Sequence, residues 1–478
     1  MIQISNELIR NILFWIQQKR WLIIIALVGT LMYHLPYPAN ISLSGYRTII
    51  LCIIVILLII TEPIPLPAVA LLIAILEVSF HIAPATEVAK TYMNDSVFFI
   101  MGSLMMAVAI VKQGLDTRLA LGIIRLTGNK VHHIVFGFTC ISALLASFIG
   151  EHTVVALMLP VGLSIIKNCS QQKSIPNLTA LILFSIAYGS TIGSIGTPSG
   201  GARNAIMLEY LRTMTENGIT LTYLEWIIMA YPMVIIVMLG TAFLLKRAFK
   251  PEMLRMDTAI RRLKIQVAHK GTLTGNEFLS ILIFILVFFC WVFLNEYYGL
   301  GIIAIGGAFL YMAFGLVDWK DVSKHTNWGV ILLFAAVISL GVQMKNTGAA
   351  VWIGNSLTSQ FSSLITQFTI IPYILNIFLT TLFSNIMSSS ATVAVLGPIM
   401  LNMGIDPLYM GMTTAISSAF GYFSAVAAPA CMIIYSSGMV KISDFIKAGW
   451  RIYIMSSLTL LIVYKYYWPL VIGLTNFK

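Results

Sequence analysis

Apolar runs long enough to cross a lipid bilayer recur along the whole chain. A hydrocarbon core of about 30 Å requires about 20 apolar residues in a helix. Of the 478 residues, 59% are hydrophobic and only 10% are charged, which is more apolar surface than a soluble core could bury. We therefore predict an all-α polytopic membrane protein. Uninterrupted candidate spans lie at approximately 21–35, 46–61, 63–80, 96–112, 226–245, 277–296, 299–316, 328–344 and 450–470.

Four further apolar segments are interrupted in their middle by Gly, Pro or clusters of small polar residues. They lie at about 133–166, 179–212, 370–403 and 411–439. A break in a helix at membrane depth exposes N–H and C=O groups that lipid cannot satisfy. Such breaks are tolerated where they face protein, water or a ligand. We therefore expect the functional site at these four segments.

The distribution of Lys and Arg predicts the orientation of the spans. The segment 246–270 carries eight Lys and Arg against Glu252 and Asp257, whereas 213–225 has neither Lys nor Arg but holds Glu216 and Glu225. Cytoplasmic loops of membrane proteins are enriched in Lys and Arg, so 246–270 is predicted to be cytoplasmic. If 133–166 is a re-entrant hairpin from the cytoplasm and 370–403 one from outside, every basic cluster falls inside. These clusters lie at 10–20, 112–130, 167–173, 246–270, 320–324 and 441–447.

This arrangement predicts a multi-pass protein of the cell inner membrane, with a cytoplasmic N-terminus and the C-terminus outside. A net charge of +11 raises the question of nucleic acid, but no basic stripe interleaved with aromatic residues supports that partner. The pattern favours contact with membrane lipid instead. The five cysteines lie apart in apolar stretches, which argues against a disulfide framework and a zinc site. The sequence shows no HExxH motif and no serine nucleophile elbow, so we do not expect an enzyme.

The two halves of the chain resemble one another at three places in the same order. In the longest match, each stretch begins with a small residue and has a proline ten positions later. Because one hairpin is expected inside and the other outside, the repeats are predicted to be inverted, as in many secondary transporters. The matched pairs are 111–114 with 344–348, 150–160 with 388–398, and 195–198 with 427–429. The predicted organisation is 1–45 as N-terminal cytoplasmic segment and first span, 46–245 as the first repeat, 246–276 as a basic cytoplasmic linker, and 277–478 as the second repeat.

Glu151, His152 and Arg203 lie in otherwise apolar, interrupted segments, and ionisable groups at membrane depth usually mark a function. Glu151 and Arg203 are expected to meet, because the repeat places their segments together. Three interpretations remain open. The pair replaces a bound sodium ion and locks the hairpin to the loop; Arg203 binds a substrate carboxylate; or Glu151 or His152 couples transport to protons.

Several motifs resemble the divalent anion:sodium symporter family over nearly the whole chain from Gly45 onward. The stretch 61–67 (TEPIPLP) is similar to the family's Thr-Glu-Ala-(Ile/Leu)-Pro-Leu segment, and 328–334 (WGVILLF) is similar to the opening of its second repeat. The two hairpin tips coincide with the family's paired Ser-Asn-Thr motifs. The resemblance implies a homodimer that moves di- or tricarboxylates, or sulfate, with sodium as coupling ion. It also implies an elevator-type movement of a transport domain against a scaffold.

The tip motifs depart from the family pattern. The first motif reads Gly150, Glu151 and His152 here, and the second is a run of three serines that lacks the Asn. Arg203 stands where the family commonly has proline. We expect cation-coupled transport of a small divalent anion. A sodium-independent anion exchanger, in which the Glu151–Arg203 pair replaces one sodium site, and a passive anion channel are the alternatives.

Half-helix N-termini suit anions, whereas unwound carbonyls and hydroxyls suit sodium. The expected substrate-binding residues are Glu151, His152, Thr153, Thr197, Pro198, Arg203, Asn204, Ser388, Ser389, Ser390, Ala428 and Pro429. The expected sodium ligands are Gly150, Gly193, Gly196, Ser388, Thr392 and Ala427. No other cofactor is expected.

Overall fold

The computed structural model describes residues 19–38, 40–114, 128–170, 174–215, 218–257, 273–360, 368–425 and 427–475. Parts of several features named above lie outside these residues: Glu216, most of the N-terminal segment, and parts of the basic clusters at 10–20, 112–130, 167–173 and 246–270. Within the described residues the chain is helical, and eight helices are long and apolar enough to cross a membrane. The structure therefore confirms an all-helical architecture with many candidate spans.

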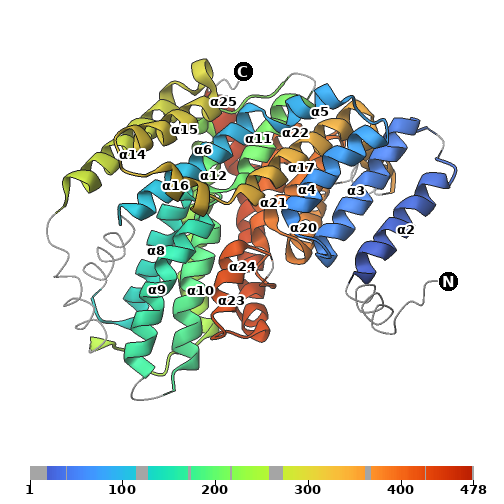
Figure 1. Cartoon of the computed structure of the whole chain (residues 1–478). Coiled ribbons are helices and arrows are strands. Elements are labelled where there is room, and N and C mark those ends of the chain that lie inside the picture. Colours follow the sequence, from blue (N-terminus) through green and yellow to red (C-terminus); the bar gives the residue numbers. More distant parts are fainter. Residues whose placement is uncertain are drawn as a thin grey trace, which may run out of the picture.

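The helices of the two halves follow the same order (Figure 1). A leading helix α2 (Arg20–His34) precedes the first half. That half comprises α3 (Leu43–Thr61), α4 (Leu66–Ser79), α5 (Ala85–Tyr92), α6 (Asp95–Lys112), α8 (Val131–Ile149), α9 (Glu151–Ser170), α10 (Pro176–Gly193), η1 (Pro198–Gly200), α11 (Ala202–Met214) and α12 (Tyr223–Ala248).

The second half follows the same order: a pair of long helices, a short helix, a long helix, a helical hairpin, a broken helix and a closing helix. It comprises α14 (Gly275–Phe293), α15 (Asn295–Ala313), α16 (Trp319–His325), α17 (Trp328–Asn346), α18 (Ala349–Gln360), α20 (Ile371–Ile386), α21 (Ser389–Leu401), α22 (Pro407–Ser417), η2 (Ser418–Phe420), α23 (Pro429–Ser436) and α24 (Ile442–Ile462), followed by η3 (Val463–Tyr467) and α25 (Trp468–Thr475). Its α18 and α25 have no counterpart among the described residues of the first half.

Contacts between the two halves are reciprocal. Helix α4 packs against α17, and the corresponding pair α15 and α6 pack against each other. In the same way α11 contacts α21 while α23 contacts α9. The α6–α15 contact is close because Gly102 has no side chain: a Cβ there would lie 2.5 Å from the carbonyl carbon of Ala304. Such exchange of equivalent partners is the pattern expected of two related halves packed about a twofold axis.

The apolar core surrounds α10, whose residues from Leu178 to Gly193 are all buried. In Figure 1, α8, α9 and α10 lie together beside α23 and α24, whereas α3, α4, α17 and α20 form the opposite side and α2 lies at the edge. A second buried apolar cluster joins α3, α4 and α17. The broken segments thus lie where the two sides meet.

The helix ends agree with most of the expected spans. The helices at two of the spans expected to be uninterrupted, α2 and α4, are shorter and are not among the eight long helices. The last long helix begins at Ile442 rather than near residue 450, because the capping Lys441 and Asp444 start it earlier. Pro160 and Pro398 lie inside α9 and α21, and each helix continues beyond its proline. The four interrupted segments break within 149–151, 194–201, 387–388 and 418–428.

Candidate functional site

The first hairpin turns at Gly150, between α8 and α9. Gly150 has a φ of 81°, a backbone region that glycine adopts without the steric cost borne by other residues. Its carbonyl accepts a hydrogen bond from Val154 N at 3.2 Å, which is the first bond of α9. The N–H groups of the first turn of α9, from Glu151 onward, therefore point out of the helix end. The tip is a local concentration of positive partial charge.

The break between α10 and α11 is held by one amide side chain. Asn204 Nδ2 donates to the carbonyl oxygens of Ser194 at 2.8 Å and Thr197 at 2.7 Å. Thr197 Oγ1 accepts from Gly200 N at 3.1 Å and donates to the carbonyl of Ser147 in α8. These bonds satisfy the backbone groups that the break exposes, as burial requires. They also tie the broken helix to the first hairpin.

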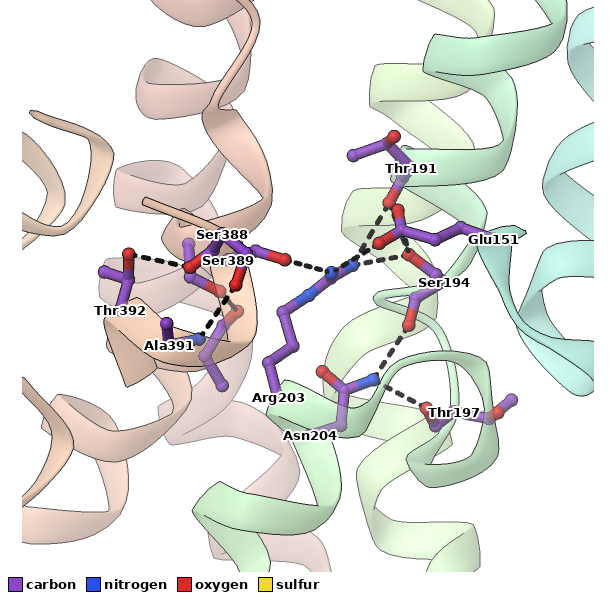
Figure 2. A network of polar contacts seen from close by, with 12 residues as sticks. Glu151, Thr191, Ser194, Thr197, Arg203, Asn204, Ser388, Ser389, Ala391 and Thr392 are labelled. Carbon is purple, nitrogen blue, oxygen red and sulfur yellow. Dashed lines mark hydrogen bonds and ion pairs between the residues drawn. The ribbon is translucent and has the colours of Figure 1, made fainter. Parts of the chain in front are cut away.

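Arg203 joins the two hairpins (Figure 2). Only 1% of its side chain is exposed. Its Nη1 lies 3.5 Å from Glu151 Oε1 and donates to Ser389 Oγ at 3.2 Å. Its Nη2 donates to the Thr191 carbonyl at 3.3 Å and to Ser194 Oγ. The predicted Glu151–Arg203 pair is therefore present, and its cation also reaches the second tip.

The second tip is built from hydroxyls. Ser388 caps α21, accepting from Ala391 N at 3.3 Å, and its carbonyl accepts from Thr392 Oγ1 at 3.1 Å. Ser389 N donates to the carbonyl of Ala427 at 3.1 Å, which ties this tip to the second broken helix. The arrangement mirrors the first tip without a charged residue of its own.

Two cavities adjoin the first tip. A small one of about 60 Å³ is lined by Gly150, Glu151, His152, Pro198 and Ser390, together with Ser199–Ala202 and apolar residues of α6 and α17. A larger one of about 500 Å³ contains His152 and Thr153 at one side and Lys112, Asp321 and His325 at another. Leu104, His152 and Val330 line both cavities. The large cavity is thus a vestibule leading to the space between the two tips.

His152 is the basic side chain on the lining of both cavities, and it is exposed there. Arg203, in contrast, is engaged by protein oxygens. At 3.5 Å the charges of Arg203 and Glu151 offset each other. An anion entering from the vestibule would therefore first meet the α9 N-terminus and His152, with the Ser390 and Ser199 hydroxyls nearby.

The other predicted residues serve the framework around these cavities. The carbonyl of Gly193 accepts from Ser147 Oγ at 2.8 Å and from Gly196 N at 2.9 Å. Ala428 and Pro429 begin α23, and Thr392 and Ala427 bond to the second tip as described above. A Cβ at Gly193 would lie 1.9 Å from the Ala143 carbonyl oxygen, so this glycine permits helix contact. Buried hydrogen-bonding capacity remains at Thr191 Oγ1, Arg203 Nε and Asn204 Oδ1, which have no partner among the described residues.

Sequence reasoning missed several residues of this network. Thr191 lies before the break and contacts Arg203 only through its backbone carbonyl. Any residue type could make this contact, so the sequence does not predict it. Ser194 and Ser199 lie inside the interrupted segment that the sequence marks as a candidate, but small polar residues are common in such breaks and neither was among the expected binding residues. Asn385, just before the second tip, accepts from Phe423 N at 2.9 Å and donates to the Thr381 carbonyl at 2.8 Å. Its place three residues before the serine run was the signal that could have identified it.

Comparison with known families gives one match over almost the whole chain. Residues 17–474 match the family described as the sodium:sulfate symporter transmembrane region. Among curated proteins, the sodium-dependent dicarboxylate transporter SdcS of Staphylococcus aureus (strains USA300 and NCTC 8325) is 27% identical over 442 residues, covering 87% of this chain and 84% of the relative.

Solved transporter structures share the fold at low sequence identity. The YdaH transporter of Alcanivorax borkumensis matches with a TM-score of 0.52 and 14% identity, covering 79% of this chain and 85% of that one. MtrF of Neisseria gonorrhoeae matches with a TM-score of 0.54 and 12% identity, covering 79% and 82%. At such identities the similarity concerns the fold alone.

Proposed function

Because the chain belongs to the sodium:sulfate symporter family, it is a multi-pass membrane transporter rather than an enzyme, and we propose that it carries a small di- or tricarboxylate by cation-coupled secondary transport. The observation that carries the proposal is the 60 Å³ cavity beside both hairpin tips, which opens on the vestibule. The relatives named for sodium-dependent dicarboxylate transport support this substrate class.

The anion binds at the small cavity with one carboxylate toward the first tip. The N–H groups of the first turn of α9 and the partial charge of the helix end favour an anionic group. His152 supplies the nearest basic side chain that is not already paired, and Ser390 and Ser199 supply hydroxyl donors. The rest of the substrate extends into the vestibule, whose apolar walls suit the carbon chain of a carboxylate.

Arg203 acts as a tethered cation at the first tip. Its guanidinium lies among a carboxylate, a carbonyl and two hydroxyls, from Glu151, Thr191, Ser194 and Ser389. Oxygen groups of these kinds also coordinate sodium at interrupted membrane helices. In this proposal the coupling sodium binds at the second tip, where the ligands come from Ser388, Thr392 and Ala427.

The remaining parts of the proposal concern movement and assembly. We assign residues 46–245 and 277–478 to two inverted repeats, a division supported by the shared helix order and the reciprocal contacts. The hairpins α8–α9 and α20–α21 are re-entrant from opposite faces, and the N-terminus is cytoplasmic. Alternating access is elevator-like in a homodimer of the inner membrane, as the family resemblance implies.

Sodium-independent anion exchange is the second candidate. The Arg203–Glu151 pair favours it, because a fixed guanidinium offsets the charge of Glu151 at the first tip without any dissociable ion. An exchanger carries one anion in for each anion out and needs no coupling gradient. The two candidates therefore differ in what drives net uptake.

Transport in proteoliposomes separates these candidates. The purified full-length protein is reconstituted, and uptake of labelled succinate is measured with an inward sodium gradient, with potassium in its place, and with unlabelled succinate preloaded inside. Protein-free liposomes are the control. Cation-coupled transport gives saturable uptake that the sodium gradient accelerates. Uptake that needs internal succinate and ignores sodium identifies an exchanger, and flux that does not saturate identifies a channel.

A binding measurement tests the substrate class independently. Thermal unfolding is followed in detergent with succinate, citrate, sulfate or lactate added. A ligand at a hundred times its dissociation constant stabilises the folded state by about 2.7 kcal/mol. Succinate or citrate is expected to raise the unfolding temperature more than lactate. Equal shifts for all four anions would contradict a site for a di- or tricarboxylate.

A further inference from the structure

An apolar groove of about 440 Å³ separates the leading helix α2 from α4, with α3 between them. It extends along α2 from Leu22 to Tyr33, and Leu72 and Leu76 of α4 form the opposite wall. Thr30 is polar, but its hydroxyl donates to the Ala26 carbonyl at 2.8 Å and is satisfied within the helix. The groove therefore offers a largely apolar surface, and its other polar lining residues are Tyr33 and Ser79.

Helix α2 is attached to the rest of the protein chiefly through α3. Its buried residues are Ile25 and Gly29, and a Cβ at Gly29 would lie 2.7 Å from Ile54 of α3. Figure 1 shows α2 at the edge of the molecule beside α3. Helix α2 packs closely against α3, but the groove separates it from α4. One side of α2 is therefore left uncovered within the membrane.

One end of the groove carries a cation. Arg47 lies with its guanidinium carbon 5.3 Å from the centre of the Tyr33 ring, and its Nη1 donates to the Phe80 carbonyl at 2.9 Å. Tyr33, Ser79 and Phe80 all line this end. A guanidinium carries five N–H donors in a planar fork that matches phosphate oxygens. The groove thus combines an apolar channel with a phosphate-compatible end.

The groove is about as long as one acyl chain. From Leu22 to Tyr33 a helix rises by about 16 Å at 1.5 Å per residue. Half of a hydrocarbon core of about 30 Å is about 15 Å. A single acyl chain extends over about half of the core, so the groove can hold one acyl chain along its length. The dimensions and the charge at the end fit an amphiphile better than a protein segment.

We propose that the α2–α4 groove binds one anionic phospholipid, with an acyl chain along α2 and its phosphate beside Arg47. The lipid fills the space between α2 and α4 and stabilises the position of α2 on the outer side of the fold. This site is separate from the anion cavity at the hairpin tips.

Native mass spectrometry of the full-length protein tests the site. The protein is delipidated in detergent, incubated with phosphatidylglycerol or phosphatidylcholine, and the bound lipid is counted. One phosphatidylglycerol per chain is expected, with weaker retention of phosphatidylcholine. Arg47→Gln should reduce phosphatidylglycerol retention about fivefold, since a basic residue contributes about 1 kcal/mol toward an anionic headgroup. Ala26→Phe should block the groove and reduce retention of both lipids.

Matched variants keep the test independent of folding. Arg47→Lys retains the charge and should restore most of the binding, and Arg451→Gln removes a cation that stacks on Trp450, away from the groove. A symmetric elution peak verifies the fold of each variant. Unchanged retention in both Arg47→Gln and Ala26→Phe would overturn the proposal. So would a change in dimer content in Ala26→Phe without lipid loss, which assigns the groove to a second copy, or higher retention after deletion of residues 1–18, which assigns it to the N-terminal segment.

Discussion

The two hairpin tips lie at equivalent places in the two halves but differ in the charges that they bury. The first tip holds Glu151 against Arg203 at 3.5 Å, both buried. The second holds uncharged serines, one of which accepts from the same arginine. Burying a single charge is costly, so a charged tip must bring its own partner. The first tip is therefore neutralised internally, whereas the second tip has no charged residue of its own, and the proposed function assigns the mobile cation to it.

The largest expected effect comes from removing the arginine. Arg203→Ala leaves Glu151 buried without its partner, and such losses cost about 3–5 kcal/mol. We expect a much lower unfolding temperature in detergent and loss of succinate uptake. Arg255→Ala removes one member of the exposed pair with Asp257 at 3.2 Å and serves as the control, with an effect of about 0–1 kcal/mol. An Arg203→Ala protein as stable as the wild type would show that the first tip needs no internal cation.

Loss of the histidine on the first tip should affect substrate binding more than stability. His152 is exposed to both cavities, so His152→Gln removes a candidate anion partner without creating a buried void. A hydrogen bond to a charged group contributes about 1.5–3 kcal/mol, which corresponds to a rise in KM for succinate of about tenfold or more. The unfolding temperature should stay close to that of the wild type. A KM within twofold of the wild-type value would move the anion away from this tip.

Changes at the second tip should alter the sodium dependence. Thr392→Val removes the hydroxyl that donates to the Ser388 carbonyl, and a hydrogen bond of this kind contributes about 1 kcal/mol. The sodium concentration for half-maximal uptake should rise about fivefold, with little change in KM at saturating sodium. Ser436→Ala, an exposed hydroxyl on α23, is the control. If sodium dependence is the same in Thr392→Val and wild type, the second tip is not the cation site and exchange becomes the better explanation.

The smallest effect is expected at the mouth of the vestibule. Lys112 of α6 bonds to Asp321 and lies 3.2 Å from Asp318, and its proximity holds the pKa of Asp321 below the usual range. A carboxyl whose pKa is lowered on folding contributes above its ordinary pKa and loses that contribution as the pH falls through the lowered value. The pair therefore persists from pH 8 to pH 5. Lys112→Gln should change uptake less than twofold over this range, and a strong pH-dependent loss would give the rim a direct role in selection.

Most helices and all four interruptions could be predicted from the sequence. Local hydropathy indicates which segments are surrounded by lipid, and local Gly or Pro content indicates where the backbone leaves helical geometry. The break at Gly150 and the start of α21 after Ser388 lie where the motif pairs place them. The ends of the helices were predicted less accurately than their presence, since capping residues such as Asp444 extend a helix beyond its apolar run. The prolines at 160 and 398 also proved compatible with continuous helices.

Sequence alone determined that this chain spans the membrane many times, that two related segments near 150 and 388 are interrupted, and that Glu151 and Arg203 belong together. These conclusions follow from local composition and from internal repetition. Only the tertiary structure decided that Arg203 is already paired with protein oxygens, that His152 is the basic group facing both cavities, and that a groove separates α2 from α4. Such features depend on distances between residues far apart in the chain, and those distances arise from how the two halves pack against each other.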